Sequence, residues 1–357
     1  MAGKITFQTI AKSKVFSALI VLALLLLFNL FFTKNFFVIT IREGHLFGTL
    51  IDILNRGAPL MLLSMGMTLV IAATGGTDLS VGAIIAITAA MVSKLIGGNL
   101  VMVDGVQTYV TNTPMILAIV ISLGLAMGLG LWNGILVTYG KIQPIVATLV
   151  LMVAGRGIAQ LITNGQIITV YYKPFFYIGG GWFLGLPFAI FIAIFVFILA
   201  QLFTRRTSLG LFIESVGGNT QASWYAGINE KGVKLFSFIF CGFCAGVAGL
   251  IICSNIKSAD ANNAGLNTEL DAILAAVIGG TSMSGGKFSL AGSLVGALLI
   301  QTLTTTIYAF GVPPEVSLVV KSLVVVLVCF LQSSVMGNLF AKLSGRTAAA
   351  KSREAAV

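Results

Sequence analysis

Long apolar runs alternate with short polar segments along most of the chain. A helix needs roughly 20 mostly apolar residues to cross the hydrocarbon core of a bilayer, and most of these runs have about that length. The pattern therefore predicts ten membrane segments, at residues 15–33, 53–73, 79–97, 114–138, 145–164, 186–203, 233–254, 269–281, 287–310 and 314–335. The segments at 79–97 and 269–281 are short, so we expect half-helices or partly re-entrant helices there.

Composition leads to the same fold class. Hydrophobic residues make up 57% of the 357 positions and charged residues 9%, whereas a soluble domain is about 25% charged. The runs are too long and too unbroken for the alternation of a membrane β-barrel. We expect an all-α polytopic membrane protein with about ten transmembrane helices, some of them short or discontinuous.

The basic residues indicate an orientation. If the N-terminus is inside, the inside segments hold thirteen Lys and Arg residues: Lys4, Lys12, Lys14, Lys141, Arg205, Arg206, Lys231, Lys234, Lys287, Lys342, Arg346, Lys351 and Arg353. The outside segments hold five: Lys34, Arg42, Arg56, Lys173 and Lys257. Because cytoplasmic loops carry the excess of Lys and Arg, both termini should be cytoplasmic. The same rule explains the net charge of +10, so no nucleic-acid partner is expected.

No stretch has the composition of a separate soluble domain. We expect one transmembrane domain over residues 1–335 and a polar cytoplasmic tail over residues 336–357. The run at 15–33 is long and has bulky residues where a cleavage site would lie, so it is predicted to be a retained span. Small residues four apart should let helices approach closely; the pairs are Gly124 and Gly128, Gly130 and Gly134, Gly242 and Gly246, and Gly292 and Gly296.

Several kinds of chemistry are not expected. The chain has one histidine, His45, and its four cysteines lie in apolar segments where packing is the expected role, so no metal site is predicted. No G-x-x-x-x-G-K-[ST] motif occurs, which excludes ATP hydrolysis by that route. Carboxylates are scarce within the predicted spans, which counts against a transporter coupled to protons or sodium.

The stretch TGGTDLSVG (residues 74–82) places Asp78 between two uncharged segments. A carboxylate just before a helix that begins near Leu79 can accept hydrogen bonds from free backbone N–H groups and lies at the positive end of the helix dipole. Asp78 is therefore interpreted either as a helix cap or as a contributor to a solute path. A similar small-residue run at 279–286 precedes the next returning span, where Ser282 or Ser284 should be the cap.

The hydrophilic stretch 207–234 is predicted to contain a short helix. Asn219 is a good N-cap, and Gly227 occupies the position of a left-handed C-cap. A helix of about seven residues within 219–227, outside the membrane on the basic side, is therefore predicted from its two caps. It is either an ordinary loop helix or a rigid handle through which a separate motor acts.

Four segments in matching order resemble a known family. They are similar to motifs of the permease subunits of bacterial ATP-binding-cassette (ABC) sugar importers of the ribose, xylose, arabinose and galactofuranose group. The segments are GLFIESVGGNTQASWYAGINEKGVKLFSFIFCGFCAGVAGL, GGTDLSVGA, QPIVATLVLMVAGRGIAQLITNGQIIT and ELDAILAAVIGGTSMSGGKFSLAGSLVGALL. Thr77 and Phe288 depart from the residues common in that group. Residues 42–60 and 259–280 look most similar to the galactofuranose permeases.

The resemblance implies a type II ABC importer-like permease bundle without catalytic residues or a cofactor of its own, in the bacterial inner membrane. ATP and Mg would be bound by a separate ATPase subunit. The other implied partners are a second permease, as homo- or heterodimer, a periplasmic sugar-binding protein and membrane lipid. The residues implied in coupling to the ATPase are Glu214, Gly217, Gly218, Asn219, Ala222, Ser223 and Gly227.

Polar residues in or near the spans are candidates for a sugar path. Arg156 lies mid-span, where an arginine costs at least about 2.5 kcal/mol unless it finds a partner or water. It should either pair, with Asp78 or Asp271, or contact sugar hydroxyls. The candidates for the path are Asn55, Asp78, Thr148, Arg156, Asn164, Gln166, Asn262, Asn263 and Asp271.

These expectations favour one function over two alternatives. The favoured function is the membrane-spanning permease subunit of an ATP-driven importer of a monosaccharide such as galactofuranose. The alternatives are an ion-coupled secondary transporter or channel, and an ABC permease for another small polar solute such as a nucleoside or amino acid.

Overall fold

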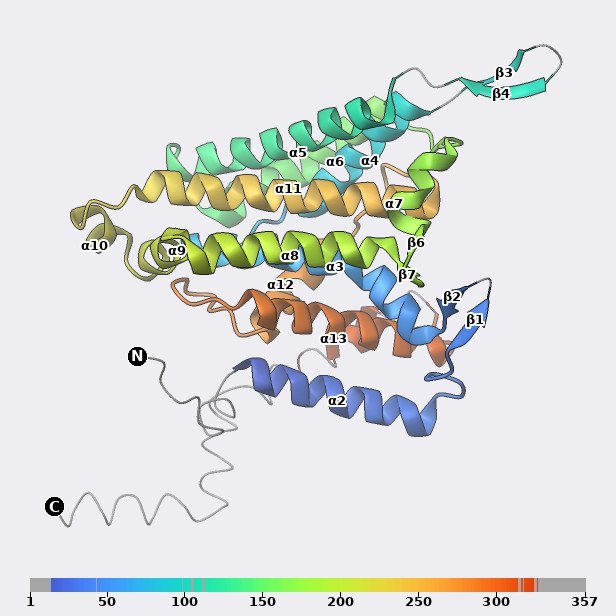
Figure 1. Cartoon of the computed structure of the whole chain (residues 1–357). Coiled ribbons are helices and arrows are strands. Elements are labelled where there is room, and N and C mark those ends of the chain that lie inside the picture. The colour runs from blue at the N-terminus through green and yellow to red at the C-terminus, as the bar shows by residue number, and fades with distance from the viewer. Residues whose placement is uncertain are drawn as a thin grey trace.

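The computed structural model describes residues 14–42, 44–97, 99–103, 106–110, 113–313, 316, 318–323 and 326. Long helices lie side by side in one bundle (Figure 1). They are α2 (Lys14–Phe32), α3 (Thr49–Thr74), α4 (Val81–Ile96), α5 (Met115–Thr138), α6 (Pro144–Thr163), α8 (Phe188–Arg206), α11 (Glu230–Ile256) and α13 (Leu290–Ala309). Six of these, all except α2 and α4, are long and apolar enough to cross a membrane.

Short elements complete the described chain. The short helices are η1 (Lys173–Phe176), α7 (Tyr177–Gly180), α9 (Leu209–Gly218), α10 (Thr220–Tyr225) and α12 (Thr268–Ile278). Antiparallel strands pair as β1 (Thr40–Arg42) with β2 (His45–Phe47), β3 (Asn99–Val103) with β4 (Val106–Val110), β5 (Ile168–Thr169) with β8 (Ser258–Ala259), and β6 (Trp182–Phe183) with β7 (Leu186–Pro187). These strands occupy connections between helices and were not predicted from the sequence.

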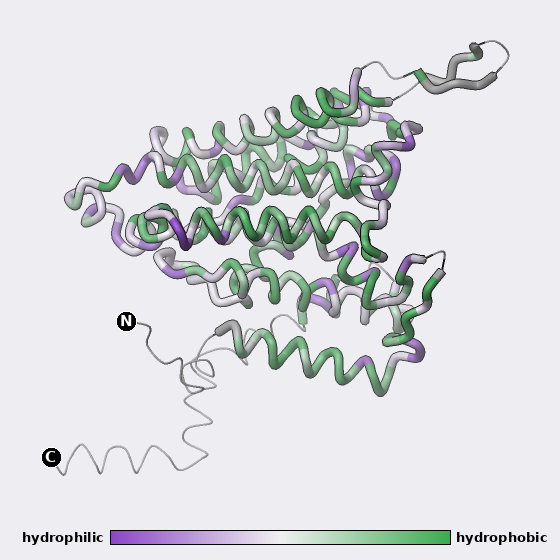
Figure 2. Tube along the Cα trace, viewed as in Figure 1, coloured by the Kyte–Doolittle hydropathy of each residue, from purple (hydrophilic) through white to green (hydrophobic). Residues whose placement is uncertain are grey.

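The bundle has two distinct ends. α9 and α10 lie at one end, here called the handle end, and the hairpins β1–β2, β3–β4 and β6–β7 lie at the other, the hairpin end (Figure 1). Figure 2 shows that the helices are hydrophobic along their middles, while hydrophilic residues gather toward the two ends. This banding is that of a bundle that spans a bilayer, with water at both ends.

Nine of the ten predicted segments coincide with a helix. The predicted segment 314–335 falls largely outside the described residues, although residues 318–323 are helical. The predicted tail at 336–357 lies wholly outside them. The two segments expected to be half-helices are α4, with 16 residues, and α12, with 11 residues. The prediction of an all-α polytopic membrane protein is therefore confirmed.

α3 forms the centre of the bundle. It is buried along almost its whole length and packs against α8, α11, α12 and α13. α4 fills the space between α5, α6 and α11. α2 packs against α13 at the edge, and large side chains such as Leu24 and Phe31 remain exposed on it, as expected of a lipid-facing helix.

Three of the four predicted glycine pairs lie at helix contacts. At the crossing of α5 with α11, the Cα of Gly242 would lie 3.2 Å from a Cβ added at Gly130. Gly296 is similarly close to the backbone of α12 at Ala275. A Cβ added at Gly124 or Gly128 would meet nothing within 4 Å, so those two glycines mark no contact in this chain.

One capping prediction is wrong. α13 is capped by Ser289, whose hydroxyl accepts a hydrogen bond from the Gly292 N–H at 3.1 Å. Ser282 and Ser284 lie earlier in the turn, where Ser282 exchanges backbone bonds within the turn itself. The turn is longer than predicted because Gly285 and Gly286, both with positive φ, extend it before the helix begins.

Candidate functional site

The handle is built from its own caps. The Asn219 side chain accepts a hydrogen bond from the Ala222 N–H at 3.0 Å and so caps α10, as predicted. Gly227 has φ +82°, its N–H donates to the Trp224 carbonyl, and the next N–H donates to the Ser223 carbonyl. This pair of bonds is a Schellman motif, which satisfies the last carbonyls of the helix. Both ends of the short helix are thus capped by residues of its own segment.

α10 contains two of the residues implied in coupling, Ala222 and Ser223, and exposes only the first. Ala222 is exposed, but Ser223 is only 3% exposed, and its hydroxyl donates to the Asn219 carbonyl and to Ser215. Ser223 therefore fixes α10 on α9. The large exposed side chains of the handle are Trp224 and Tyr225, which pack edge to face and which the sequence analysis did not single out.

Glycines allow α9 to pack closely against the bundle. A Cβ added at Gly217 would overlap the Ala72 carbonyl of α3 and lie 2.6 Å from the Gly286 nitrogen. The Gly286 N–H in turn donates to the Ala72 carbonyl at 3.0 Å. The neighbouring Gly218 has free space at its own Cβ position. Three segments, α9, the end of α3 and the turn at 279–289, are therefore in direct backbone contact at the handle end.

Asp78 lies in a buried polar cluster at the start of α4. Its Oδ1 accepts hydrogen bonds from the Ser80 N–H at 2.9 Å and the Ser80 hydroxyl at 2.6 Å. The Asn133 side chain, from α5, donates to the same hydroxyl at 2.7 Å. Asp78 Oδ2 and Asn133 Oδ1 have no hydrogen-bond partner among the described residues. The helix begins at Val81 rather than near Leu79, and its N-cap is Ser80, so Asp78 satisfies the Ser80 N–H from two residues before the N-cap.

Thr148 belongs to the same corner of the bundle. Its hydroxyl oxygen accepts from the Leu79 N–H at 3.0 Å and donates to the Pro144 carbonyl in α6. These contacts tie the TGGTDLSVG turn to the first turn of α6. The Thr148 hydroxyl is thus used both as acceptor and as donor within the protein, which favours a structural role for it.

Arg156 does not pair with Asp78 or Asp271. Its guanidinium donates instead to backbone carbonyls of Ala261, Asn262 and Ala264, at 3.3, 3.4 and 2.5 Å. One turn further along α6, Gln160 donates to the Asn262 side chain at 2.6 Å. The loop between β8 and α12 presents several backbone carbonyls to α6. The guanidinium group has five N–H donors, so one arginine can donate to several of these carbonyls at once.

The same loop is stiffened from within. The Asp260 carboxylate accepts from the Asn263 side chain at 2.7 Å and from the N–H groups of Asn262 and Asn263. The Asn263 side-chain amide, followed by these backbone donors, holds the pKa of Asp260 below its usual value. The loop ends against α4, where a Cβ at Gly82 would overlap both the Gly265 carbonyl and the Glu269 carboxylate. Asn262 and Asn263 are thus exposed residues of a loop that is anchored at both α6 and α4.

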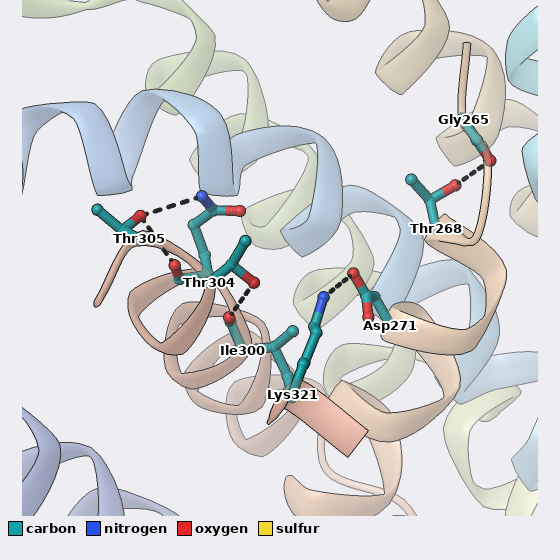
Figure 3. Close-up of polar contacts among 8 residues, drawn as sticks. Gly265, Thr268, Asp271, Ile300, Thr304, Thr305 and Lys321 are labelled. Atoms are coloured by element: carbon teal, nitrogen blue, oxygen red, sulfur yellow. Dashed lines mark hydrogen bonds and ion pairs between the residues drawn. The ribbon is translucent and has the colours of Figure 1, made fainter. Parts of the chain in front are cut away.

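A large cavity lies beside α12 and α13. It has a volume of about 610 Å³ and is lined by Leu266, Asn267, Leu270, Asp271, Leu274, Thr304, Tyr308, Leu318, Lys321, Ser322 and Val326. Figure 3 shows Lys321 reaching from the last described helical segment to Asp271 of α12, with Thr304 of α13 nearby. The Lys321 Nζ lies 2.5 Å from the Asp271 carboxylate. The partner of Asp271 is therefore Lys321, which was not predicted, and not Arg156.

A second, smaller cavity contains Asn55. It has a volume of about 330 Å³, lies between the first turns of α3 and the last turn of α11, and is lined by Asp52, Asn55, Arg56, Pro59, Ile252, Asn255 and Ile256. Asn55 Oδ1 is buried without a partner among the described residues. Asp52 and Arg56 lie four residues apart, yet neither forms an ion pair with any residue that the structure describes.

The predicted path residues therefore fall into separate places. Asp78 and Thr148 lie together at the start of α4. Asn262 and Asn263 lie in the 260–267 loop, which Arg156 contacts from α6. Asn55 and Asp271 each line a different cavity. Asn164 and Gln166 are exposed in the turn after α6, where Asn164 has φ +54° and ends the helix. Ser80, Asn133 and Glu269 are also buried polar residues. None was predicted as a site residue, because their burial depends on how the helices pack.

Comparison with known proteins places the chain in a family. Residues 49–329 match the profile described as the permease component of branched-chain amino acid transport systems. The galactofuranose transporter permease protein of Escherichia coli (strain K12) is 48% identical over 315 residues, 88% of each chain. The fructose import permease protein of Bifidobacterium longum is 37% identical over 311 residues, 86% of this chain and 83% of the relative.

More distant relatives agree. The ribose import permease protein of Escherichia coli (strain K12) is 32% identical over 334 residues, 90% of this chain and 97% of the relative. No solved structure matches the chain. The matched region contains the handle, both cavities and all the motifs quoted above. The chain belongs to this family of transport permeases and is a multi-pass membrane protein rather than an enzyme.

Proposed function

We propose that this chain is the membrane-spanning permease subunit of an ATP-driven importer that passes a monosaccharide from periplasm to cytoplasm across a bacterial inner membrane. Galactofuranose is the proposed sugar, because the permease named for it is 48% identical over 88% of each chain. Relatives named for fructose and ribose support a sugar as the solute class.

The observation that carries the proposal is the direct contact of the handle with the elements that surround the large cavity. α10 is fixed on α9, and Gly217 of α9 touches both the end of α3 and the turn at 279–289. That turn joins α12 to α13, and both of these helices line the cavity. A force applied to α10 by an ATPase subunit would therefore reach α12 through packed backbone, which transmits displacement with little loss.

The cavity has the composition of a sugar path. Its volume of about 610 Å³ lies within the roughly 300–1,000 Å³ typical of small-molecule sites. Asp271, Lys321 and Asn267 supply charged and amide groups, Thr304 and Ser322 supply hydroxyls, and Tyr308 supplies an aromatic face. An ion pair alongside a membrane span must face protein or water rather than lipid. Leu270 and Tyr308 at this cavity are 52% and 50% exposed in the single chain, so a second permease is proposed to cover this face.

The remaining parts of the proposal follow from this arrangement. A periplasmic sugar-binding protein would dock at the hairpin end, an ATPase subunit carrying ATP and Mg at the handle end, and lipid around the outside. Glu214, Gly217, Gly218, Asn219, Ala222, Ser223 and Gly227 form or support the handle. Residues 1–335 would form the single permease domain, with the polar tail at 336–357 and both termini in the cytoplasm.

Reconstitution tests the function. The chain should be co-purified with the ATPase and permease encoded beside it, placed in liposomes and supplied with the purified binding protein. Uptake of labelled galactofuranose should require ATP and the binding protein, and an excess of unlabelled galactofuranose should compete. Uptake by this chain alone down an ion gradient would contradict an ATP-driven permease, and competition by leucine but by no sugar would contradict a sugar as the solute.

Two variants test the handle in the same liposomes. Ala222→Asp adds a charge to its exposed surface, and Gly227→Val places a branched side chain at a positive φ; both should abolish uptake while protein still accumulates. Gly165→Val is the matched control, because Gly165 also has a positive φ and free space but lies in the turn after α6. Normal uptake by both handle variants would remove α10 from the coupling mechanism.

A further inference from the structure

A third cavity lies where three spans end together. It has a volume of about 450 Å³ and is formed by the end of α5 at Thr138, the turn at Lys141, the start of α6 at Pro144 and the start of α11 at Glu230. Helix ends of this kind lie at the boundary between hydrocarbon and water. The cavity is at the handle end, because Thr74, the last residue of α3, is also in its lining.

The lining of this cavity is basic. It contains Lys141, Lys231 and Lys234, with Glu230 as the only carboxylate among its lining residues. Glu230 pairs with Lys234 at 3.0 Å, which leaves the ammonium groups of Lys141 and Lys231 without an ion pair among the described residues. Lys231 is held over the ring of Tyr139 at 5.1 Å.

A buried hydroxyl lies in the same lining. The Thr138 side chain is 8% exposed, and its Oγ1 has no hydrogen-bond partner in the part of the chain that the structure describes. A buried hydroxyl normally bonds to something, because leaving it unpaired costs free energy. An anionic oxygen in the cavity would supply the missing acceptor.

Exposed apolar side chains, here called the rim, flank the turn that lines the cavity. Tyr139, Ile142, Ile145 and Val146 are all exposed large side chains that flank the turn and the first residues of α6. Their position beside the basic lining matches an amphiphile whose head is anionic and whose chains are hydrocarbon. A free anion in water would use the lysines and leave this rim unused.

We propose that this cavity binds the headgroup of an anionic phospholipid, with the phosphate between Lys141 and Lys231, the Thr138 hydroxyl as a further donor, and the acyl chains along the exposed face of α6. The lipid would join α5, α6 and the first turn of α11. Because α11 follows directly after the handle, an occupied site would restrain the segment through which the handle is attached.

The test uses the purified full-length chain in nanodiscs. Thermal unfolding is compared in phosphatidylcholine alone and in mixtures with increasing phosphatidylglycerol, for the wild type and for the double variant Lys141→Gln/Lys231→Gln. Each basic residue near the headgroups contributes about a fivefold increase in affinity for anionic lipid, so the double variant should need roughly 30-fold more phosphatidylglycerol for the same rise in melting temperature. Lys287→Gln, which changes an exposed lysine at the same end, should behave as the wild type.

Further arms identify the ligand and guard against misfolding. Lys141→Arg/Lys231→Arg should recover the response to phosphatidylglycerol, since the charges are kept, and Thr138→Val should weaken it by a smaller factor. Inorganic phosphate added to phosphatidylcholine nanodiscs should produce no shift. An equal response of the wild type and the Gln double variant would overturn the proposal, as would a shift with inorganic phosphate as large as with the lipid. A double variant that binds phosphatidylglycerol normally but no longer co-purifies with the ATPase would make the cavity a protein contact and also overturn it.

Discussion

Asp78 is fully buried, yet only one of its two carboxylate oxygens has a hydrogen-bond partner among the described residues. Its Oδ1 receives both donors of Ser80, and Asn133 completes the cluster from α5. A carboxylate with one satisfied oxygen at a helix start is sufficient for a structural role, since the cap needs one acceptor. A role in transport would instead use the second carboxylate oxygen, Oδ2, to contact the solute.

Substitution at Asp78 separates these roles. Asp78→Asn keeps an oxygen that can accept from the Ser80 N–H, so its melting temperature in detergent should stay near that of the wild type and uptake should be partly retained. Asp78→Leu leaves two buried donors of Ser80 without an acceptor and should cost about 1–3 kcal/mol of unfolding free energy for each group. Equal stability of all three forms, with uptake lost in both variants, would instead assign Asp78 to the solute path.

At this scale the sequence identified the position but not its partners. Asp78 stands out because a carboxylate between two apolar segments needs an explanation. Ser80 and Asn133 do not stand out, since their contact joins residues 53 positions apart and depends on how α5 packs beside α4. The predicted partners of Arg156 were wrong for a related reason: carboxylates can be recognised in a sequence, whereas the backbone carbonyls that a loop leaves free cannot.

Arg156 is expected to anchor the whole loop at 260–267, because its guanidinium group donates to three carbonyls of that loop. Arg156→Lys keeps the charge but offers a single ammonium in place of a planar fork with several donors, so the loop should lose part of its anchoring. Hydrogen exchange at residues 261–266 should become faster by about tenfold, which corresponds to the loss of roughly 1.4 kcal/mol. Ile158→Val, on the exposed side of the same helix, is the control. Unchanged exchange in Arg156→Lys would mean that the loop is held by its own Asp260 bonds.

The contact of α9 with α3 and the turn at 279–289 belongs to the scale of elements. Backbones approach this closely only where a glycine replaces a larger residue, and here Gly217, Gly285 and Gly286 meet. The sequence showed the G-G pairs, but not that pairs separated by some 70 residues touch each other. Double glycines also occur in ordinary loops, so the contact between these two pairs could be recognised only in the structure.

Adjacent glycines provide a sharp test of this contact. Gly217→Ala introduces a Cβ that overlaps the Ala72 carbonyl, whereas Gly218→Ala introduces one with nothing within 4 Å. Gly217→Ala should displace α9, lower stability by about 1–3 kcal/mol and uncouple ATP hydrolysis from uptake. Gly218→Ala should leave both near the wild-type level. The readouts are detergent thermal stability and the ratio of sugar imported to ATP hydrolysed; equal ratios in the two variants would exclude α9 as the link between handle and cavity.

For the whole molecule, hydrophobicity was enough to locate nine helices, because the requirement for about 20 apolar residues is set by the bilayer and not by the details of packing. The length of each hydrophilic connection was also visible. The short strand pairs and the entry of the 260–267 loop beside α4 were not, since both depend on which connections meet in space. β5 with β8 is an example, in which Ile168 pairs with Ala259.

Orientation is the last property that the sequence predicts for the whole molecule. Thirteen Lys and Arg residues against five predict that the handle end lies in the cytoplasm, and seven of the thirteen are Lys4, Lys12, Lys14, Lys342, Arg346, Lys351 and Arg353 near the termini. Tyr225 at the handle and Leu184 at the hairpin end are each 81% exposed, so each can carry a single cysteine in a background where Cys241, Cys244, Cys253 and Cys329 are serine. A membrane-impermeant maleimide should label Leu184→Cys in intact cells and Tyr225→Cys only after the inner membrane is opened. Because positive charge resists translocation across the membrane, labelling of Tyr225→Cys from outside would reverse the orientation and with it the proposed direction of transport.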